Sequence, residues 1–359
     1  MNTTQDLRRL VERTAAEAKA PGMAVAVAGP EGVLAVDAVG YADLSARRPA
    51  AVDDQYPWFS MTKIATATAA MRLHAEGLLD LDAPVGSYLP WYRPPARLGH
   101  PTTRHLLTHT AGLGNPLPIR WVRPAEQPPD PSFSSRVLAR HGAPRRRVGG
   151  RASYSNIGYL LAAEVIESVT GASVEDSVRD AVLRPLGMGS TGYCYDPRLP
   201  HSVGHVRVPA PLVPVLRRAL PTGIADAHID GYVSLRPFLV EGAGYGGLVG
   251  TVRDAARLAA VHAAGEGDDH PLLVQHDIEE MRTIRAAGKR FDHGIGWFRR
   301  PRDATRAPAF VEHYGTGGGF HNAMRIYPGR GLAMVAMANT TSGWDVDALF
   351  TRIEELAWS

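Results

Sequence analysis

The sequence contains very little cysteine and no long hydrophobic run. Cys194 is the single cysteine among 359 residues, so the chain cannot close an internal disulfide or hold a metal through several thiolates. No stretch approaches the ~18 consecutive apolar residues that a membrane-spanning helix needs. The N-terminus lacks an apolar signal core, and residues 6–13 are rich in charge. We therefore expect a cytoplasmic protein that does not bind a membrane.

Charge of one sign is not concentrated along the chain either. The formal net charge is +3, and the arginines are scattered apart from the triplet Arg145, Arg146 and Arg147. A nucleic-acid-binding protein would carry a basic stripe or patch, so no nucleic-acid partner is expected. The triplet itself is more simply interpreted as a solvated loop than as a phosphate site.

Lysine is scarce, and one lysine lies in a suggestive place. Lys19, Lys63 and Lys289 are the only lysines in a chain rich in arginine, and only a lysine can lose its proton when its surroundings lower its pKa. Ser60 and Lys63 begin an Ala/Thr-rich stretch, residues 64–76, that predicts a helix. On that helix they share a face, and the field of a helix N-terminus favours a serine oxyanion and an uncharged amine. The pair is a candidate nucleophile and base, although an ordinary capped helix start has the same spacing.

Strand-like and helical segments are unevenly distributed. Terminal helices are expected at residues 4–19 and 344–358. Strand patterns occur near both ends, at residues 23–28, 33–39, 294–299, 310–313, 321–327 and 332–338, with turns at 29–32 and 328–331. Between them, helices are expected at residues 103–108, 132–141, 156–170, 173–184, 251–264 and 271–287.

This distribution predicts an α+β fold, an α/β sandwich. An antiparallel sheet from residues 1–57 and 290–359, flanked by the terminal helices, would enclose a mainly helical subdomain, residues 58–289. Residues 112–131 and 195–240 are expected to be long loops, the second irregular but packed. A site would form in the cleft between the two parts.

Tyr154 and Asn156 directly precede the strong helical pattern of residues 157–170. Near a lysine ammonium the pKa of Tyr154 would fall, and its hydroxyl could act as a base or proton carrier. The amide of Asn156 could orient both Lys63 and a substrate carbonyl. The alternative is a capping asparagine beside a half-buried tyrosine.

A third candidate element, His313 to Thr316, ends a predicted strand. Gly315 would allow a ligand to approach the strand backbone closely. The N–H of Thr316 could then join that of Ser60 in an oxyanion hole. The alternative is a bulge glycine before a flexible turn at residues 317–319.

In order, these motifs resemble those of the serine β-lactamase and penicillin-recognising family, in particular its class C-like branch of esterases and DD-peptidases. The corresponding residues are Ser60-x-x-Lys63, Tyr154-x-Asn156 and His313-x-Gly315. Five further segments also resemble sequences typical of that branch: residues 105–113, 154–161, 169–171, 185–188 and 246–251. The resemblance runs from about residue 21 to the C-terminal helix and implies a β-lactamase/transpeptidase-like fold.

The resemblance also implies roles for the site residues. Ser60 would be the acylated nucleophile, Lys63 would assist its deprotonation, and Tyr154 would pass a proton to the leaving group and activate the deacylating water or alcohol. Asn156 would hold the acyl group, and the N–H groups of Ser60 and Thr316 would form the oxyanion hole.

His313 departs from the family pattern. It stands where β-lactamases have a cationic lysine that helps to bind the substrate carboxylate. A largely neutral histidine would bind a carboxylate less well. We therefore expect β-lactam hydrolysis to be weak or absent.

Other patterns have simpler interpretations. The pairs His105/His109 and His201/His205 have i, i+4 spacing but lack the glutamate of a zinc motif, so no metal or cofactor is expected. Residues 242–247 are rich in glycine without phosphate-loop spacing, which indicates close backbone packing. Trp58, Trp121 and Trp297 could line an acyl pocket, although single aromatic residues more often belong to the core.

The expected activity is that of an SxxK serine hydrolase acting on a small-molecule ester or amide, most simply a carboxylesterase. One alternative is an acyltransferase of a small-molecule biosynthetic pathway that uses the same acyl-serine. A second is a D-amino-acid peptidase or weak β-lactamase. The sequence leaves the acyl group, the acceptor and the oligomeric state open.

Overall fold

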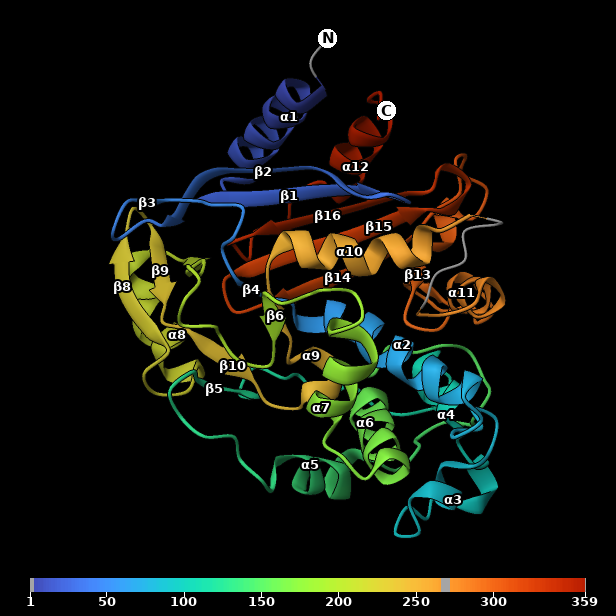
Figure 1. Ribbon diagram of the computed structural model, residues 1–359. Helices are drawn as coiled ribbons and strands as arrows, with labels where there is room; N and C mark the ends of the chain where they lie inside the picture. Colours follow the sequence, from blue (N-terminus) through green and yellow to red (C-terminus); the bar gives the residue numbers. More distant parts are fainter. Residues whose placement is uncertain (1–2, 266–271, 359) are drawn as a thin grey trace.

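The largest sheet is built from strands near both ends of the chain. The computed structural model describes residues 3–265 and 272–358. Within them this sheet has eight antiparallel strands (Figure 1). Their order is β12 (Asp292–His293), β13 (Phe298–Arg299), β14 (Val311–Gly317), β15 (Phe320–Tyr327), β16 (Leu332–Ala338), β1 (Gly22–Gly29), β2 (Gly32–Asp43) and β3 (Arg48–Pro49). The predicted sheet is thus confirmed, although the strand expected at residues 294–299 is reduced to β13.

Alternate residues of β1 face two separate cores, because successive side chains of a strand point to opposite faces. Met23, Val25 and Val27 lie in the core shared with two helices from the chain ends. The alanines between them, from Ala24 to Ala28, lie in the core on the other face, where their small size lets a helix pack closely. The three helices are α1 (Thr3–Ala18), α12 (Val346–Glu354) and α10 (Val252–Ala263).

The expectation that the terminal helices flank the sheet was incomplete. Figure 1 shows α1 and α12 side by side on one face and α10 along the other. Helix α10 comes from the inserted segment, residues 58–289, yet it packs on β1, β15 and β16. The inserted segment therefore supplies the second covering layer of the sheet.

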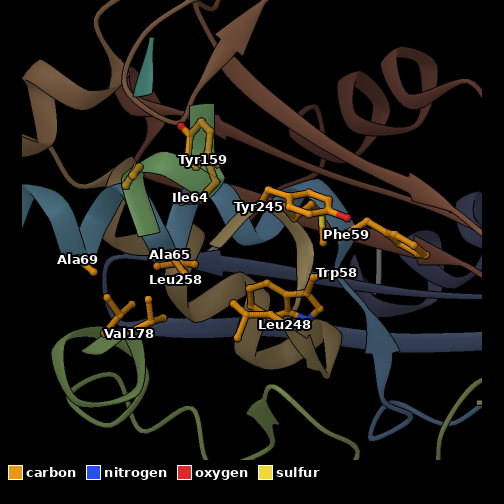
Figure 2. Close-up of a cluster of buried hydrophobic side chains, with 14 of the residues drawn as sticks. Trp58, Phe59, Ile64, Ala65, Ala69, Tyr159, Val178, Tyr245, Leu248 and Leu258 are labelled. Carbon is orange, nitrogen blue, oxygen red and sulfur yellow. The ribbon is translucent and has the colours of Figure 1, made fainter. Parts of the chain in front are cut away.

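Helix α2 (Thr62–Ala75) is the centre of the helical part. Every residue from Thr62 to Met71 is buried, so this part of the helix has no solvent-facing side. Figure 2 shows its Ile64 and Ala65 in one cluster with Leu258 of α10, Tyr159 of α6 (Asn156–Thr170) and Trp58. Packing on all sides fixes the N-terminal end of α2, where Ser60 and Lys63 lie.

Other helices of this part pack on α2, on α6 or on α10. They are α3 (Val85–Tyr88), α4 (Thr103–Leu107), α5 (Phe133–His141), α7 (Val174–Val178) continued by a π-helical turn (Arg179–Leu183), α9 (Ala243–Gly246) and α11 (Gln275–Arg282). The helix expected at residues 271–287 is shorter, and Pro271 lies outside the described residues. It ends at Arg282 because the N–H groups of Arg285 and Ala286 donate to the carbonyl of His293 instead.

The expectation of an irregular loop over residues 195–240 is wrong. This segment contains β7 (Gly204–Arg207), α8 (Val213–Ala219), β8 (Ala225–Ile229), β9 (Tyr232–Leu235) and β10 (Phe238–Val240). Strands β7, β9 and β8 form a small sheet, and β10 pairs with β5 (Val122–Pro124) inside the other expected loop. Strands this short carry too little periodicity to be recognised without their partners. The same holds for the sheet of β4 (Tyr56–Pro57), β11 (Val249–Gly250) and β6 (Thr191–Gly192).

No single helix in the described part of the chain is long and apolar enough to cross a membrane. Helix α6 and the following segment, Val174–Leu183, reach that length and composition only together, and they are bent by 81° at the break between them. Most of α6 is buried in the protein core.

Candidate active site

Ser60 lies on a strained turn at the start of α2. Phe59, directly before it, has a φ of 48°, in the left-handed region that residues other than glycine rarely adopt. Residues Phe59–Met61 form a short 3-10 turn (η1) that runs into α2. The first N–H groups of a helix have no intrahelical partner and carry its positive dipole end. The Ser60 backbone therefore offers a favourable place for a developing negative charge.

Lys63 is fully buried one helical turn after Ser60. Its Nζ lies 3.1 Å from Ser60 Oγ, 2.8 Å from Asn156 Oδ1 and 2.8 Å from the carbonyl oxygen of Tyr245. Burial, with no carboxylate to compensate for it, places the pKa of Lys63 well below that of an ordinary lysine. The site therefore favours the uncharged amine.

Asn156 is positioned by the start of α6. Ser155 caps this helix, since its hydroxyl accepts from the N–H of Gly158 and donates to the carbonyl of Gly114. The N–H of Asn156 donates to the side chain of Asn115. Because Lys63 donates to Oδ1 of Asn156, the amide nitrogen of that side chain is directed away from Lys63 and is available to a ligand.

Tyr154 lies against Lys63, with the lysine Nζ 5.0 Å from the centre of its ring. The ring also packs on His109, at 4.5 Å between centroids. Burial raises the pKa of the Tyr154 hydroxyl above its ordinary value, and hydrogen bonding to Ser60 only partly offsets this. The expected fall of this pKa is therefore wrong. An ammonium would have lowered it, but the same burial lowers the pKa of Lys63 and so disfavours its charged form.

His313 faces Tyr154 from β14, with ring centroids 6.3 Å apart. Its Nδ1 lies 2.9 Å from the carbonyl oxygen of Tyr314, which can only accept, so Nδ1 carries the proton of a neutral ring. Burial places the pKa of His313 well below its ordinary value, because it disfavours the charged ring. The expectation of a largely neutral histidine is confirmed.

Gly315 allows β14 to lie directly against the Ser60 turn. A β-carbon at residue 315 would overlap with the carbonyl oxygen of Trp58, and one at Gly317 would overlap with the ring of Phe59. The segment that approaches Gly315 closely is therefore the protein's own backbone at Trp58. The sequence had suggested that a ligand would approach the strand there.

Thr316 lies on β14 beside the Ser60 turn. Its two neighbours on the strand pack directly on that turn, Gly315 against the Trp58 carbonyl and Gly317 against the Phe59 ring. Ser60 and Thr316 both line the two cavities that meet here.

The two cavities form the arms of one cleft. The larger, which we call the polar arm, has a volume of about 930 Å³ and includes Tyr154 and His313 in its wall. The smaller, the apolar arm, has a volume of about 290 Å³. Its apolar wall consists of Phe59, Pro118, Ile119, Trp121, Val122, Leu220, Ile224, Leu235, Phe238, Val240 and Tyr245. The cleft can therefore take a compact apolar group on one side of Ser60 and a larger polar group on the other.

The other patterns of the sequence have structural roles. Trp121 lines the apolar arm, whereas Trp58 and Trp297 are fully buried. His105 takes part in the capping box of α4, and His109 Nδ1 accepts from the N–H of Ser155. The glycine-rich residues 242–247 pack closely on α6, as expected, because a β-carbon at residue 244 would overlap with that helix.

Several site residues were not recognised in the sequence. The carbonyl of Tyr245 holds Lys63, and His293 packs edge-on against His109 with ring centroids 4.7 Å apart. A backbone carbonyl carries no sequence signal. His293 lies in a short strand, and only tertiary packing brings it to the site. Arg146, which was interpreted as part of a solvated loop, lines the polar arm.

Comparison with known proteins agrees with this architecture. Esterase EstB from Burkholderia gladioli is 27% identical over 338 residues, which cover 88% of this chain and 86% of the esterase. A solved structure of D-amino acid amidase from Ochrobactrum anthropi SV3 has a TM-score of 0.78 and 22% identity, covering 97% of each chain. The class C beta-lactamase from Rhodobacter sphaeroides has a TM-score of 0.71 and 21% identity, covering 99% of this chain and 97% of that structure. These two structural similarities show the fold alone.

A family model described as Beta-lactamase matches residues 7–357. The match includes every strand of the main sheet and the whole cleft. The chain therefore belongs to the beta-lactamase family.

Proposed function

We propose that this protein is a serine hydrolase that cleaves an ester through an acyl intermediate on Ser60. The hydrogen bonding of Lys63 carries the proposal. An uncharged amine has two N–H groups and one lone pair. The oxygens of Asn156 and Tyr245, each 2.8 Å from Nζ, can only accept and take the two N–H groups. The lone pair is left for the hydroxyl of Ser60, 3.1 Å away.

Acylation follows from this arrangement. Ser60 Oγ attacks the ester carbonyl carbon while its proton passes to Lys63. The negative charge that develops on the carbonyl oxygen is stabilised by the N–H groups of Ser60 and Thr316. The bond to the leaving oxygen then breaks. Tyr154 gives that oxygen its proton and recovers one from the Lys63 ammonium.

The raised pKa of Tyr154 supports a role as a neutral proton carrier rather than as a phenolate base. In deacylation the same groups transfer protons in the reverse direction. A water molecule loses its proton through Tyr154 to Lys63 and attacks the acyl carbon. Ser60 Oγ then leaves and takes a proton back from the Lys63 ammonium.

The two arms suggest how a substrate is oriented. Asn156, whose amide nitrogen can donate to an acyl group, lines only the apolar arm. Tyr154, which protonates the leaving oxygen, lines only the polar arm. We therefore place the acyl group in the apolar arm and the leaving alcohol in the polar arm.

Similarity to esterase EstB supports an ester, rather than a D-amino acid amide, as the substrate. A substrate with a free ammonium needs a carboxylate or a similar acceptor nearby. The residues that line the two arms include no aspartate or glutamate. The neutral His313 likewise gives no support to strong β-lactam hydrolysis.

Acyl transfer is the second candidate, and the volume of the polar arm favours it. About 930 Å³ is enough to hold an acceptor alcohol or amine beside the acyl-Ser60. Such an acceptor would attack the acyl carbon in place of water. Turnover of an ester with added alcohols and amines would separate the two reactions, because transfer gives a new ester or amide and hydrolysis gives only the free acid.

Hydrolysis of p-nitrophenyl butanoate tests the main proposal. We expect Ser60→Ala to abolish turnover and to abolish labelling by a fluorophosphonate probe, which peptide mapping should locate at Ser60 in the unaltered chain. Ser135→Ala removes an exposed serine of α5 and is the matched control. Unchanged turnover in Ser60→Ala would exclude this mechanism.

A further inference from the structure

The polar arm is lined by an unusual concentration of positive charge. Its lining includes no carboxylate. Five basic side chains contribute to its wall: Arg146, Arg151, Lys289, Arg290 and Arg300. They come from three separate segments, before α6, before β12 and after β13. The chain as a whole has a net charge of only +3, so this concentration is local to the cleft.

Four of these cations have no acidic partner. Elsewhere on the protein, surface arginines commonly form salt bridges, such as Arg8 with Asp37 or Arg104 with Asp82. Arg146, Arg151, Lys289 and Arg290 form none within residues 3–265 and 272–358, and all four are exposed. Their charges are therefore available to a ligand in the arm.

Two neutral contacts orient these side chains. Arg151 donates to the carbonyl of Gly288 at 2.7 Å, which ties the segment before α6 to the segment before β12. The guanidinium of Arg290 lies 5.2 Å from the centre of the Phe291 ring. Neither contact neutralises a charge, so the two segments are held together with their cations on one wall.

The fifth cation, Arg300, is only weakly balanced. It donates to the Tyr314 hydroxyl at 2.9 Å, and its nearest carboxylate oxygen, on Glu312, is 3.9 Å away. Glu312 is buried and already pairs with Arg325 at 2.7 Å. Arg300 thus adds positive charge to the arm from the side of β14.

Like charges gathered in a concave site raise the local potential and attract anions. Guanidinium groups also present paired N–H donors that match the oxygens of phosphate. A single carboxylate would balance only one of the five cations. A phosphate monoester brings close to two negative charges and three acceptor oxygens.

We propose that the polar arm binds a phosphate group carried by the leaving alcohol of the substrate. This inference rests on the proposed esterase function, because it assigns the polar arm to the leaving group. The substrate class is then an ester between a compact apolar acid and a phosphorylated alcohol. Hydrolysis releases the apolar acid and the phosphorylated alcohol, and the phosphate ester bond itself is not cleaved.

Three esters of butanoic acid test the proposal. Their leaving groups are 4-hydroxyphenyl phosphate, 4-hydroxybenzoate and the neutral 4-hydroxybenzamide. Each kcat/KM is divided by the rate of hydroxide hydrolysis of the same ester, which corrects for the different leaving groups. We expect the phosphate ester to exceed the benzamide ester by about tenfold or more, as one charge-assisted contact can supply. High salt should reduce this advantage, because the Debye length falls from about 10 Å at 0.1 M to about 3 Å at 1 M.

Charge-removing variants locate the site. Arg146→Gln, Lys289→Gln and Arg290→Gln should each lower the ratio of the phosphate ester to the benzamide ester severalfold. Arg207→Gln removes an exposed arginine of β7 outside both arms and should leave the ratio unchanged. Equal corrected rates for the phosphate and benzamide esters would overturn the proposal. A carboxylate ester that equals the phosphate ester would overturn the assignment to phosphate.

A binding measurement keeps this proposal separate from the proposed function. Titration calorimetry of Ser60→Ala with 4-hydroxyphenyl phosphate needs no turnover. Binding that is weakened by Arg146→Gln supports the phosphate site even if no ester is hydrolysed. Absence of binding to Ser60→Ala, when Ser60 of the unaltered chain is labelled by a fluorophosphonate, overturns the phosphate site and leaves the proposed hydrolase function intact.

Discussion

Gly315 on β14 lies so close to Trp58 that a β-carbon at residue 315 would overlap with the Trp58 carbonyl oxygen. Trp58 is two residues before Ser60. The contact therefore sets the spacing between the Ser60 turn and the N–H of Thr316.

We expect Gly315→Ala to push β14 away from the Ser60 turn. The overlap should lower the free energy of unfolding by about 1–3 kcal/mol. It should also lower kcat for p-nitrophenyl butanoate, because the two N–H groups would no longer converge. Gly329→Ala, in the turn after β15, is the matched control, since a β-carbon there meets nothing within 4 Å. If the two variants behave alike in denaturant titration and turnover, close packing at Gly315 is not what positions the site.

Tyr154→Phe should slow hydrolysis of an alkyl ester by about 10²–10⁴-fold, the usual contribution of one acid–base group. The loss in kcat/KM should be much smaller for p-nitrophenyl butanoate, because p-nitrophenolate leaves without being protonated. Steady-state kinetics with ethyl butanoate and p-nitrophenyl butanoate measure the difference in kcat/KM, which reports acylation and not the deacylation step that both esters share. Equal losses in kcat/KM on both esters would show that Tyr154 does not act on the leaving group.

Lys63 should make the stability of the protein depend on pH. Its pKa is far lower in the folded chain than in the unfolded chain, where it is about 10.4. Between those two values unfolding takes up a proton, so stability rises with pH and is lost as pH falls. The unfolding free energy of the unaltered chain, relative to Lys63→Met, should increase with pH below the unfolded pKa, by at most about 1.4 kcal/mol per pH unit. Denaturant titrations at pH 7, 8 and 9 check this, and parallel curves for the two proteins would contradict it.

Trp121→Ala should change the preferred length of the acyl chain. The ring lines the apolar arm and packs edge-on against Phe133 and Tyr245. Its removal leaves space for a longer chain, and each added methylene that is buried should raise kcat/KM about fourfold relative to the unaltered protein. A series of p-nitrophenyl esters from butanoate to octanoate measures this. Trp91→Ala, which removes an exposed tryptophan outside both arms, should leave the chain-length profile as it is.

The sequence by itself determined the local parts of the site. Ser60 and Lys63 are three residues apart, so a helix alone brings them to one face, and the structure places them 3.1 Å apart. Asn156 begins α6 as predicted, because the cap at Ser155 and the left-handed Gly171 are local signals. The antiparallel sheet also follows from alternating patterns near both ends of the chain.

Only the tertiary structure decided the charge of the site. Whether Lys63 keeps its proton depends on Asn156, Tyr245 and the packed helices that exclude water, and these lie 93 or more residues away along the chain. The same burial raises the pKa of Tyr154, opposite to the direction expected from a neighbouring ammonium. Arg146 and Lys289 become neighbours in one wall only when the segments before α6 and β12 pack together. Sequence spacing sets which groups can share a helix face, whereas desolvation and long-range contacts set which of them are charged.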